Sequence, residues 1–475
     1  MAAGKGTRMK SALPKVLHRL GGRALLQHVL DTASRLDARS AVVITGHGAQ
    51  VVEEKTNAIY SIANESINTS TTAKFILQFV RQEPQLGTGH AVQQAVPCLP
   101  DDGVVLVLSG DVPLMQADTL QHLIALCQGD GSGDKLALLS IDFANPTGYG
   151  RIVRSGDKVQ AIVEQKDATE AQKAINEVYS GIMAAPAKLL KAWLTRLDNK
   201  NAQGEYYLTD VVKFAVADGV DVVAHKIDDA VQVAGINSPE QLAELERAYQ
   251  LRQAHALMEQ GVRLADPARF DLRGMLTCGQ DVEIDINCIF EGHVSLGAGV
   301  RVGAHCVIAN ASIGDGAVIH PFTHIEGGKL GENLDVMVGA GALIGPFARL
   351  RPGAKLGAEV HIGNFVEVKN STLADGAKAN HLAYLGDATV GERVNFGAGS
   401  ITANYDGANK HRTVIEADVH VGSNCVLVAP VTLGAGGTVG GGSTITKSTP
   451  AGALSVARGK QVSIANWQRP KKAAK

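Results

Sequence analysis

The first half of the chain alternates short apolar runs with segments of helical spacing. Mostly apolar runs occur at 41–45, 75–80 and 104–108, a pattern typical of strands buried on both faces. Residues 24–36 and 90–96 carry apolar side chains at helical spacing. Strands that alternate with helices predict an open, mostly parallel α/β sheet. Ligands of such sheets gather at the carboxyl ends of the strands.

The pattern changes at Pro239, where one long helix is predicted. Residues 239–261 place Leu242, Leu245, Tyr249 and Leu257 on one face, with Pro at the start and Gly at the end. We interpret this segment as a connecting helix, and a last helix of the first domain is the alternative. The predicted organisation is a first domain over 1–238, the connecting helix over 239–261 and a second domain over 262–475.

The second half repeats an aliphatic residue every six positions. Two runs of five such anchors occur, and three further anchors precede them: Ile344, Leu350, Leu356, Ile362, Val368; Val421, Leu427, Leu433, Val439, Ile445; and Leu296, Val302, Ile308. A six-residue period predicts a parallel β-helix whose anchors point inward. Glycine follows many anchors and permits tight corners. Aromatic residues are only 4% of the chain, which suits a narrow prism.

Length and charge narrow the class of protein. A chain of 475 residues is too long for one ordinary core. The 45 basic residues balance 47 acidic ones, which predicts no nucleic-acid or membrane partner. No apolar run reaches about 18 residues and no signal peptide begins the chain. The six cysteines form no CxxC pair and are expected to be buried thiols, which predicts a cytoplasmic protein.

The N-terminal segment 2–9 is rich in glycine and precedes Lys15. Its glycines allow backbone N–H groups to approach phosphates, while Arg8 and Lys15 supply positive charge. The segment matches neither a Walker A loop nor GxGxxG. A glycine-rich surface loop is the alternative, but with Lys15 at this spacing the segment resembles the signature of sugar-1-phosphate nucleotidyltransferases.

Asp111 follows the predicted strand at 104–108, within Ser109-Gly110-Asp111. A carboxylate at this position is suited to hold Mg²⁺ beside nucleotide phosphates. Capping of the next helix is the alternative.

Polar residues accumulate where the six-residue rhythm breaks, at 347–353, 364–369 and 378–387. A longer interruption at 401–413 is expected to be a loop that leaves the prism. A single histidine on a β-helix is usually a solvated face residue, but His381 accompanies several cationic side chains. Glu367 is expected either to orient catalytic groups or to form a corner salt bridge.

Together these segments resemble the bifunctional N-acetylglucosamine-1-phosphate uridyltransferase/glucosamine-1-phosphate acetyltransferase family over nearly the whole chain. The resemblance implies a Rossmann-like α/β domain, a left-handed parallel β-helix and a homotrimer. It implies acetyl transfer from acetyl-CoA to glucosamine 1-phosphate, then uridylyl transfer from UTP to N-acetylglucosamine 1-phosphate with Mg²⁺. The product is a precursor of peptidoglycan and lipopolysaccharide.

The resemblance also implies a role for each matching residue. Uridylyl transfer would use Ala2, Ala3, Gly4, Arg8, Lys15, Gln82, Gly87, Thr88, Ser109, Gly110, Asp111, Gly150, Glu164, Tyr179 and Asn237, with Asp111 and Asn237 on the metal. His381 would be the general base of acetyl transfer, since the ordinary histidine pKa suits neutral pH. The sugar phosphate would contact Arg351, Lys369, Tyr384, Asn395 and Lys410, and acetyl-CoA would contact Ala398, Asn404, Tyr405, Ser423, Gly441 and Arg458.

Two positions depart from the family pattern, and two other functions stay open. Tyr179 stands where the family often has Asn, and Gly441 stands where Ala is typical. One alternative is a monofunctional nucleotidyltransferase whose β-helix only oligomerises, and the other is a non-catalytic solenoid. The cluster around His381 argues against the first, and Asp111 with Lys15 argues against the second.

Met1 stands where the family has the last residue of its first strand. We therefore expect the natural protein to begin about ten residues upstream. Loss of the four or five buried aliphatic side chains of that strand, at about 1.5–3 kcal/mol each, would be comparable to the net stability of a domain. The alternative is a genuine short form in which the first site is weakened and acetyl transfer survives.

Overall fold

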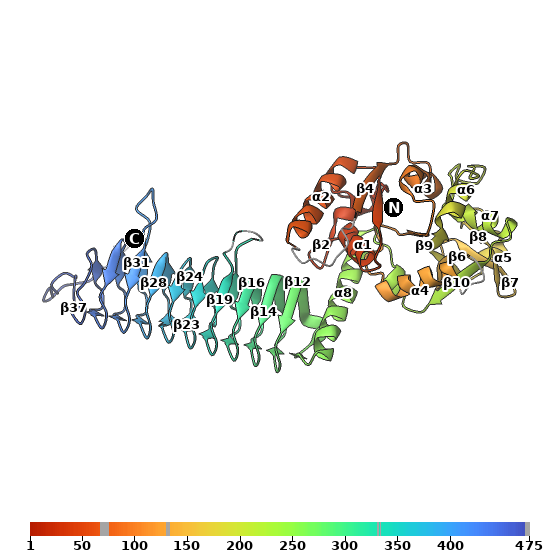
Figure 1. Ribbon diagram of the computed structural model, residues 1–475. Coiled ribbons are helices and arrows are strands. Elements are labelled where there is room, and N and C mark those ends of the chain that lie inside the picture. Colours follow the sequence, from red (N-terminus) through yellow and green to blue (C-terminus); the bar gives the residue numbers. More distant parts are fainter. Residues whose placement is uncertain (67–75, 130–133, 330–331, 333, 471–475) are drawn as a thin grey trace, which may run out of the picture. The chain divides into compact units, whose positions relative to one another are not determined.

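The computed structural model describes residues 1–66, 76–129, 134–329, 332 and 334–470 (Figure 1). The chain divides into two compact units, Met1–Tyr249 and Gln250–Lys475. The long predicted helix is α8, Pro239–Glu259, and it contains the boundary between the two units. No helix within the described ranges is long and apolar enough to cross a lipid bilayer.

The first unit alternates helices and strands as predicted. The predicted runs at 41–45, 75–80 and 104–108 correspond to β3, β4 and β5, although residue 75 lies outside the described part of the chain. The helices are α1 Leu25–Ser34, α2 Ala49–Ser66, α3 Thr88–Ala95, α4 Ala117–Gln128, α5 Glu170–Lys173, α6 Ala187–Leu194 and α7 Val211–Ala217. The strands are β1 Arg19–Leu20, β2 Arg23–Ala24, β3 Ser40–Thr45, β4 Ile76–Arg81, β5 Val104–Val107, β6 Leu136–Asp142, β7 Arg151–Ser155, β8 Lys158–Val163, β9 Glu177–Pro186 and β10 Val222–Ile227.

The expectation of a mostly parallel sheet is wrong for the larger sheet of this unit. Its strands run in the order β10-β6-β9-β7-β8, with β5 also paired to β9. Only β10 and β6 are parallel there, because β9 runs antiparallel to β5, β6 and β7, and β7 runs antiparallel to β8. β9 is almost wholly buried, so its apolar pattern resembles that of a buried parallel strand and does not encode direction.

The start of the chain lies beside the ends of two strands. Ala2 forms a parallel bridge with Thr45 of β3, and its N–H donates to the Ile44 carbonyl at 2.8 Å. The N–H of Gly110, just after β5, donates to the Met1 carbonyl at 2.8 Å. The glycine-rich segment therefore leaves the sheet next to Asp111, at the carboxyl ends of β3 and β5.

The second unit is a parallel β-helix whose strands stack in successive coils (Figure 1). One face contains β11 Arg263–Leu264, β13 Glu283–Ile284, β15 Arg301–Val302, β17 Val318–Ile319, β20 Leu343–Ile344, β23 His361–Asn364, β26 Lys378–His381, β29 Asn395–Phe396, β32 His420–Val421, β35 Thr438–Val439 and β37 Leu454–Ser455. The other strands are β12 Phe270–Cys278, β14 Cys288–Leu296, β16 Val307–Ile313, β18 His324–Glu326, β19 Val336–Val338, β21 Arg349–Leu350, β22 Lys355–Leu356, β24 Glu367–Lys369, β25 Thr372–Leu373, β27 Tyr384–Gly386, β28 Ala388–Val390, β30 Ile401–Ala403, β31 Thr413–Ile415, β33 Val426–Val428, β34 Val431–Leu433 and β36 Thr444–Ile445.

Register in this unit follows the predicted repeat. Leu343 pairs with His361, and His361 pairs with Lys378, so one coil takes about 18 residues, or three six-residue repeats. Every predicted anchor is buried, with at most 5% exposure. The predicted interruption at 401–413 begins with β30 and ends at the first residue of β31, and residues 404–412 between them form a loop that projects from the coils (Figure 1).

Glycine is not the only residue at the tight corners. His305, Phe322, Phe347, Phe365 and Leu382 all have positive φ, between 50° and 62°. From His305 to Phe365 their rings stack from coil to coil, with centroids 4.9–5.4 Å apart. Ring stacking along this corner compensates for a backbone conformation that non-glycine residues rarely adopt.

Candidate active sites

In the first unit, the glycine-rich segment packs against Lys15. Gly6 has φ of +60°, and a Cβ atom there would lie 2.8 Å from the Cβ of Lys15, so only glycine permits this approach. Lys15 begins the short helix η2, Lys15–Leu17. Ala2 and Ala3 are buried, whereas Gly4 and Arg8 are exposed. This arrangement leaves the loop surface and the Arg8 guanidinium free to meet an anion.

Lys15, Asp111 and Asn237 converge although they are far apart in sequence. Lys15 Nζ lies 2.6 Å from Asp111 Oδ2 and 3.0 Å from Asn237 Oδ1, across separations of 96 and 222 residues. The helix that follows Asp111 is α4, and its N-cap residue is Gln116. Asp111 is therefore not a cap, and its carboxylate faces Lys15 and the Asn237 amide.

Gln82, Gly87 and Thr88, three of the residues expected to serve uridylyl transfer, lie together around the start of α3. The Gln82 side chain is 5% exposed and donates to the Gly87 carbonyl at 2.9 Å. Gly87 has φ of 109°, and a Cβ atom there would lie 2.6 Å from the Tyr206 carbonyl oxygen. Thr88 Oγ1 accepts from the N–H of Leu208 at 3.1 Å.

Gly150, Glu164 and Tyr179 form a second group, which is linked to Thr88 through the adjacent residues Leu208 and Thr209. The N–H of Tyr179 donates to the Gly150 carbonyl at 2.9 Å, and a Cβ atom on Gly150 would lie 3.6 Å from Glu164 Oε1. Burial raises the pKa of Glu164. The Tyr179 hydroxyl is buried and has no hydrogen-bond partner among the described residues, and burial, with the nearby Glu164 charge, raises its pKa. Ser109 Oγ is 3.5 Å from a Cβ position at Gly181, on the same strand as Tyr179.

Two side chains next to this group were not predicted from the sequence. Thr209 Oγ1 donates to Glu164 Oε1 at 2.9 Å. Arg151 is 1% exposed, donates to the Tyr149 carbonyl and donates to Gln165 Oε1 at 2.6 Å. Arg151 directly follows Gly150, so that position was a signal, whereas nothing local distinguishes Thr209.

In the second unit, His381 lies at the end of β26 beside Asn364 of β23. His381 Nδ1 is 2.9 Å from Asn364 Oδ1, and the two residues are register partners on neighbouring coils. Both line a hollow of about 450 Å³, together with Gly345, Pro346, Phe347, Gly363, Phe365 and Asn380. The hollow places an imidazole next to the exposed aromatic corner.

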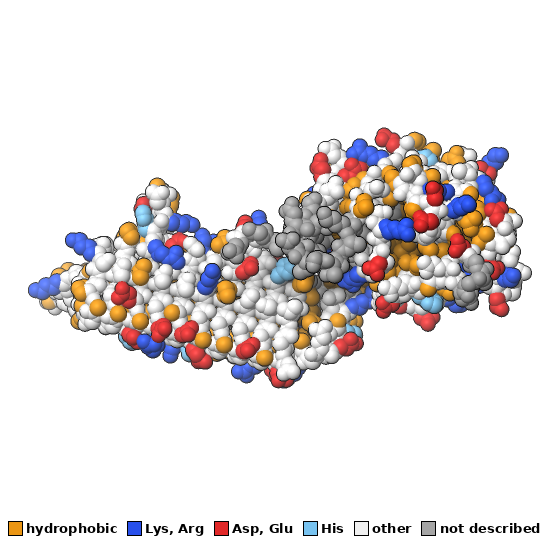
Figure 2. All heavy atoms as spheres, viewed as in Figure 1, with side chains coloured by type: hydrophobic (Ala, Val, Ile, Leu, Met, Phe, Trp, Pro, Cys, Tyr) orange, Lys and Arg blue, Asp and Glu red, His pale blue; other side chains and the backbone are white. Residues whose placement is uncertain are grey.

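Three cationic side chains gather close to one another on this unit. The pKa of Lys369 is lowered by several causes. The largest is the close contact with the Lys410 ammonium, followed by burial and then by the charge of Arg351. Arg351 Nη1 also donates to Glu367 Oε1 at 2.7 Å, so of the two expectations for Glu367 the structure shows the salt bridge. Figure 2 shows Lys and Arg side chains gathered near the projecting loop. Mutually close cations form a site suited to an anion.

The remaining predicted residues of this unit follow the coils beyond His381. Asn395 is exposed on β29, and Tyr384 of β27 is the register partner of Glu367. Arg458 donates to the Gly441 carbonyl at 2.6 Å, and a Cβ atom on Gly441 would lie 3.4 Å from the Ser423 carbonyl oxygen. These three residues therefore form one strip.

Asn404 and Tyr405 differ from each other in exposure. Asn404 is buried, and its amide donates to Asp387 Oδ2 at 2.5 Å. Tyr405 is 61% exposed, and its hydroxyl donates to the Gly407 carbonyl at 2.6 Å. The Ala398 carbonyl accepts from the N–H of Asn424 at 2.7 Å.

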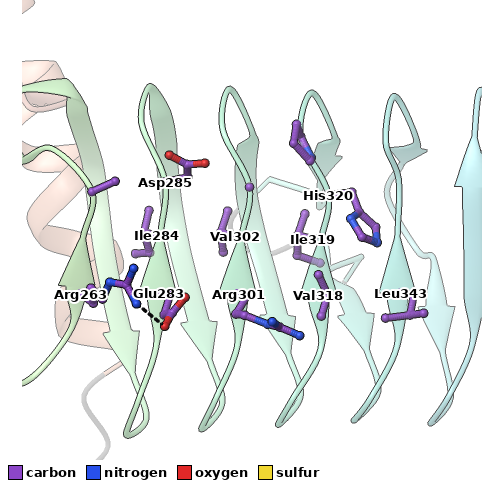
Figure 3. Close-up of a pocket in the computed structure, with 13 residues that line it drawn as sticks. Arg263, Glu283, Ile284, Asp285, Arg301, Val302, Val318, Ile319, His320 and Leu343 are labelled. Atoms are coloured by element: carbon purple, nitrogen blue, oxygen red, sulfur yellow. Dashed lines mark hydrogen bonds and ion pairs between the residues drawn. The ribbon is translucent and has the colours of Figure 1, made fainter.

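A second hollow, of about 520 Å³, lies over strands β11 to β20 (Figure 3). An ion pair of 2.7 Å between Arg263 and Glu283 lies at one end, and His320 lies towards the other. None of the site residues predicted from the sequence lines this hollow, although the predicted anchor Val302 does.

Comparison with known families agrees with the division into two units. The MobA-like NTP transferase domain matches residues 1–178. The bacterial transferase hexapeptide family (six repeats) matches 335–370, and the hexapeptide repeat of succinyl-transferase matches 293–320 and 412–447. The chain therefore combines a nucleotidyltransferase domain with a β-helix of the hexapeptide transferase families.

Similar proteins define the family more closely. The chain is 76% identical over 472 residues to the bifunctional protein GlmU of Albidiferax ferrireducens, with 99% of each chain covered. It is 74% identical over 483 residues to that of Polaromonas sp. strain JS666, with 100% of this chain and 98% of that one covered. The chain belongs to the GlmU family of bifunctional uridyltransferase/acetyltransferases, which make UDP-N-acetylglucosamine.

Proposed function

We propose that the first unit performs uridylyl transfer at the cluster of Lys15, Asp111 and Asn237. The observation that carries this proposal is their convergence within 3.0 Å from three distant parts of the chain. Arg8 and Lys15 hold phosphates of UTP, Gln82 with Gly87 and Thr88 faces the uracil, and Gly150, Glu164 and Tyr179 face the sugar. An oxygen of N-acetylglucosamine 1-phosphate attacks the α-phosphate of UTP, and pyrophosphate leaves.

Mg²⁺ fits the donor set of this unit. A carboxylate and an amide oxygen are hard ligands of the kind that Mg²⁺ prefers, and the metal needs only one or two protein ligands when phosphates and water supply the rest. We assign it to Asp111 and Asn237. When bound, Mg²⁺ neutralises charge on the phosphates. The chain contributes position: Arg8 and Lys15 align the phosphates, and the sugar-facing residues align the attacking oxygen.

For the second unit we propose that His381 is the general base of acetyl transfer. An amide oxygen can only accept a hydrogen bond, so Asn364 Oδ1, 2.9 Å from Nδ1, holds the hydrogen on Nδ1 and leaves the Nε2 lone pair available. Nε2 takes a proton as the amine of glucosamine 1-phosphate attacks the acetyl thioester, the C–N bond forms, the C–S bond breaks and CoA leaves. Arg351, Lys369 and Lys410 hold the sugar phosphate.

Acetyl-CoA, in this proposal, lies along the coils beyond His381, past Ala398, Asn404 and Tyr405. Ser423, Gly441 and Arg458 follow on later coils, and Tyr384 and Asn395 face the sugar. Acetylation precedes uridylylation, because the acetylated sugar phosphate is the acceptor for UTP. The functional division follows the predicted bounds 1–238 and 262–475, and the protein is cytoplasmic, where its co-substrates are made.

We further propose a homotrimer assembled through the β-helix. The hollow at His381 is open, and Phe347 and Phe365, two of its lining residues, are 48% and 56% exposed. A neighbouring chain would cover these rings and complete the wall around acetyl-CoA.

One experiment tests both sites. Glucosamine 1-phosphate, acetyl-CoA, UTP and Mg²⁺ are incubated with the protein, and both products are measured by mass. For the variants the two steps are assayed separately, with N-acetylglucosamine 1-phosphate supplied for uridylyl transfer. His381→Ala is expected to abolish CoA release and to leave UDP-sugar formation nearly intact, and Asp111→Asn is expected to do the reverse. Loss of both activities in either folded variant would contradict the assignment of each site to its own unit.

A further inference from the structure

The ammonium of Lys15 lies where the proposed metal has its ligands. Lys15 Nζ is 2.6 Å from Asp111 Oδ2 and 3.0 Å from Asn237 Oδ1. Mg²⁺ bound to both oxygens would lie about 2.0–2.1 Å from each. A dication and an ammonium that share the same two oxygens repel each other, so the metal and this contact of Lys15 exclude one another.

The backbone segments that carry the two oxygens are held together by the fold, and each oxygen is on a short side chain, whereas the Lys15 ammonium is at the end of a long, flexible side chain. The N–H of Ile236 donates to the Asp111 carbonyl at 2.9 Å, which fixes the segment before Asn237 against Asp111. The N–H of Asn237 donates to Gln241 Oε1 at 2.8 Å. Gly235 lies beside the pair, since a Cβ atom there would be in ordinary contact with Asp111 Oδ2, at 3.8 Å. Lys15 is therefore the part that has to be displaced.

We propose that Lys15 is an internal competitor of the metal, and that nucleotide phosphates open the metal site by drawing its ammonium away. The inference rests on the proposed assignment of Mg²⁺ to Asp111 and Asn237. Lys15 packs against Gly6 of the glycine-rich segment. Phosphates bound at this segment therefore offer the ammonium an alternative partner. Because coupling between two bound ligands is reciprocal, the nucleotide raises affinity for the metal and the metal raises affinity for the nucleotide.

Metal binding to the full-length protein without nucleotide tests this competition. Mn²⁺ serves as the probe, and the free ion is counted by electron paramagnetic resonance. Lys15→Met is expected to tighten Mn²⁺ binding by about tenfold or more, the order expected when a charge-assisted hydrogen bond to the carboxylate is removed. Lys15→Gln keeps a hydrogen-bond donor but has no charge. Its Mn²⁺ affinity should lie between those of the unsubstituted protein and Lys15→Met. Lys10 is an exposed lysine just after the glycine-rich segment and serves as the control. Lys10→Met removes the same charge and should change the Mn²⁺ affinity by less than about twofold.

A second titration with UTP present measures the coupling. UTP also binds Mn²⁺ in solution, but to the same extent in every sample. A difference in Mn²⁺ affinity between the unsubstituted protein and a variant is therefore due to the protein. UTP should raise the Mn²⁺ affinity of the unsubstituted protein by a larger factor than that of Lys15→Met. Thermal unfolding verifies that each variant is folded.

Two results would overturn the proposal, and they are distinguishable. If Lys15→Met binds Mn²⁺ no more tightly than the unsubstituted protein, while Asp111→Asn abolishes binding, the metal site stands and the competition is wrong. If Asp111→Asn leaves Mn²⁺ binding to Lys15→Met unchanged, the proposed metal site itself is wrong, and the competition falls with it.

Discussion

At the scale of single residues, Asn364 has a specific role in the proposed acetyl transfer, where it determines which nitrogen of His381 carries the hydrogen. Asn364→Asp would keep an acceptor 2.9 Å from Nδ1 but add a negative charge. A nearby carboxylate favours the charged imidazolium over the neutral imidazole. The unprotonated base then forms only at higher pH, and the acidic limb of the kcat/KM profile for acetyl transfer should move upward. An unchanged profile would show that Asn364 does not contact the working base.

Glu164 gives a second residue-scale prediction, for stability against pH. Burial raises its pKa, so the folded state binds the proton more tightly than the unfolded chain. The contribution of Glu164 to the free energy of unfolding is therefore largest below the ordinary glutamate pKa, about 4.3, and is lost as pH rises through the raised value. Glu164→Gln removes this titration. The melting temperature of the variant minus that of the unsubstituted protein should be larger at pH 8 than at pH 4. A difference that is the same at both pH values would contradict the prediction.

At the scale of elements, strand β23 offers an inward and an outward residue side by side. Ile362 is 0% exposed in the core of the coils, and Ile362→Ala should cost about 2–5 kcal/mol. His361, its half-buried neighbour, faces outward, and His361→Ala should cost about 0.5 kcal/mol or less. Heat inactivation of acetyl transfer measures both. Equal losses would mean that β23 does not present alternate faces to core and solvent.

At the scale of the whole molecule, exposed rings predict the oligomeric state. Phe347 and Phe365 stack at 5.4 Å on the open side of the hollow that contains His381. Light scattering should give the mass of three chains of 49.6 kDa each. Phe365→Glu should dissociate them and reduce acetyl transfer more than uridylyl transfer, because a charge cannot be buried cheaply in an apolar contact. An acetylating monomer at assay concentration would contradict the trimer.

Much of the molecule follows from local sequence patterns. The six-residue anchors predict the coils, since an inward side chain recurs at the same place in every repeat. Strands β3, β4 and β5 follow from their apolar runs. The glycine-rich segment followed by Lys15 indicated a nucleotidyltransferase by its resemblance to a family signature, and the close approach of Gly6 to Lys15 is a finding of the structure. In each case the signal lies within a few residues of the structure that it predicts.

Tertiary structure alone decided the direction of β9, the aromatic corner and the contacts that complete each site. The direction of β9 depends on which strands it pairs with, and its buried pattern is the same in either sense. Lys15 meets Asp111 and Asn237 over 96 and 222 residues, and Asn364 meets His381 only because two coils are in register. Periodicity reports which face of an element is buried, whereas these contacts depend on how distant elements are brought together.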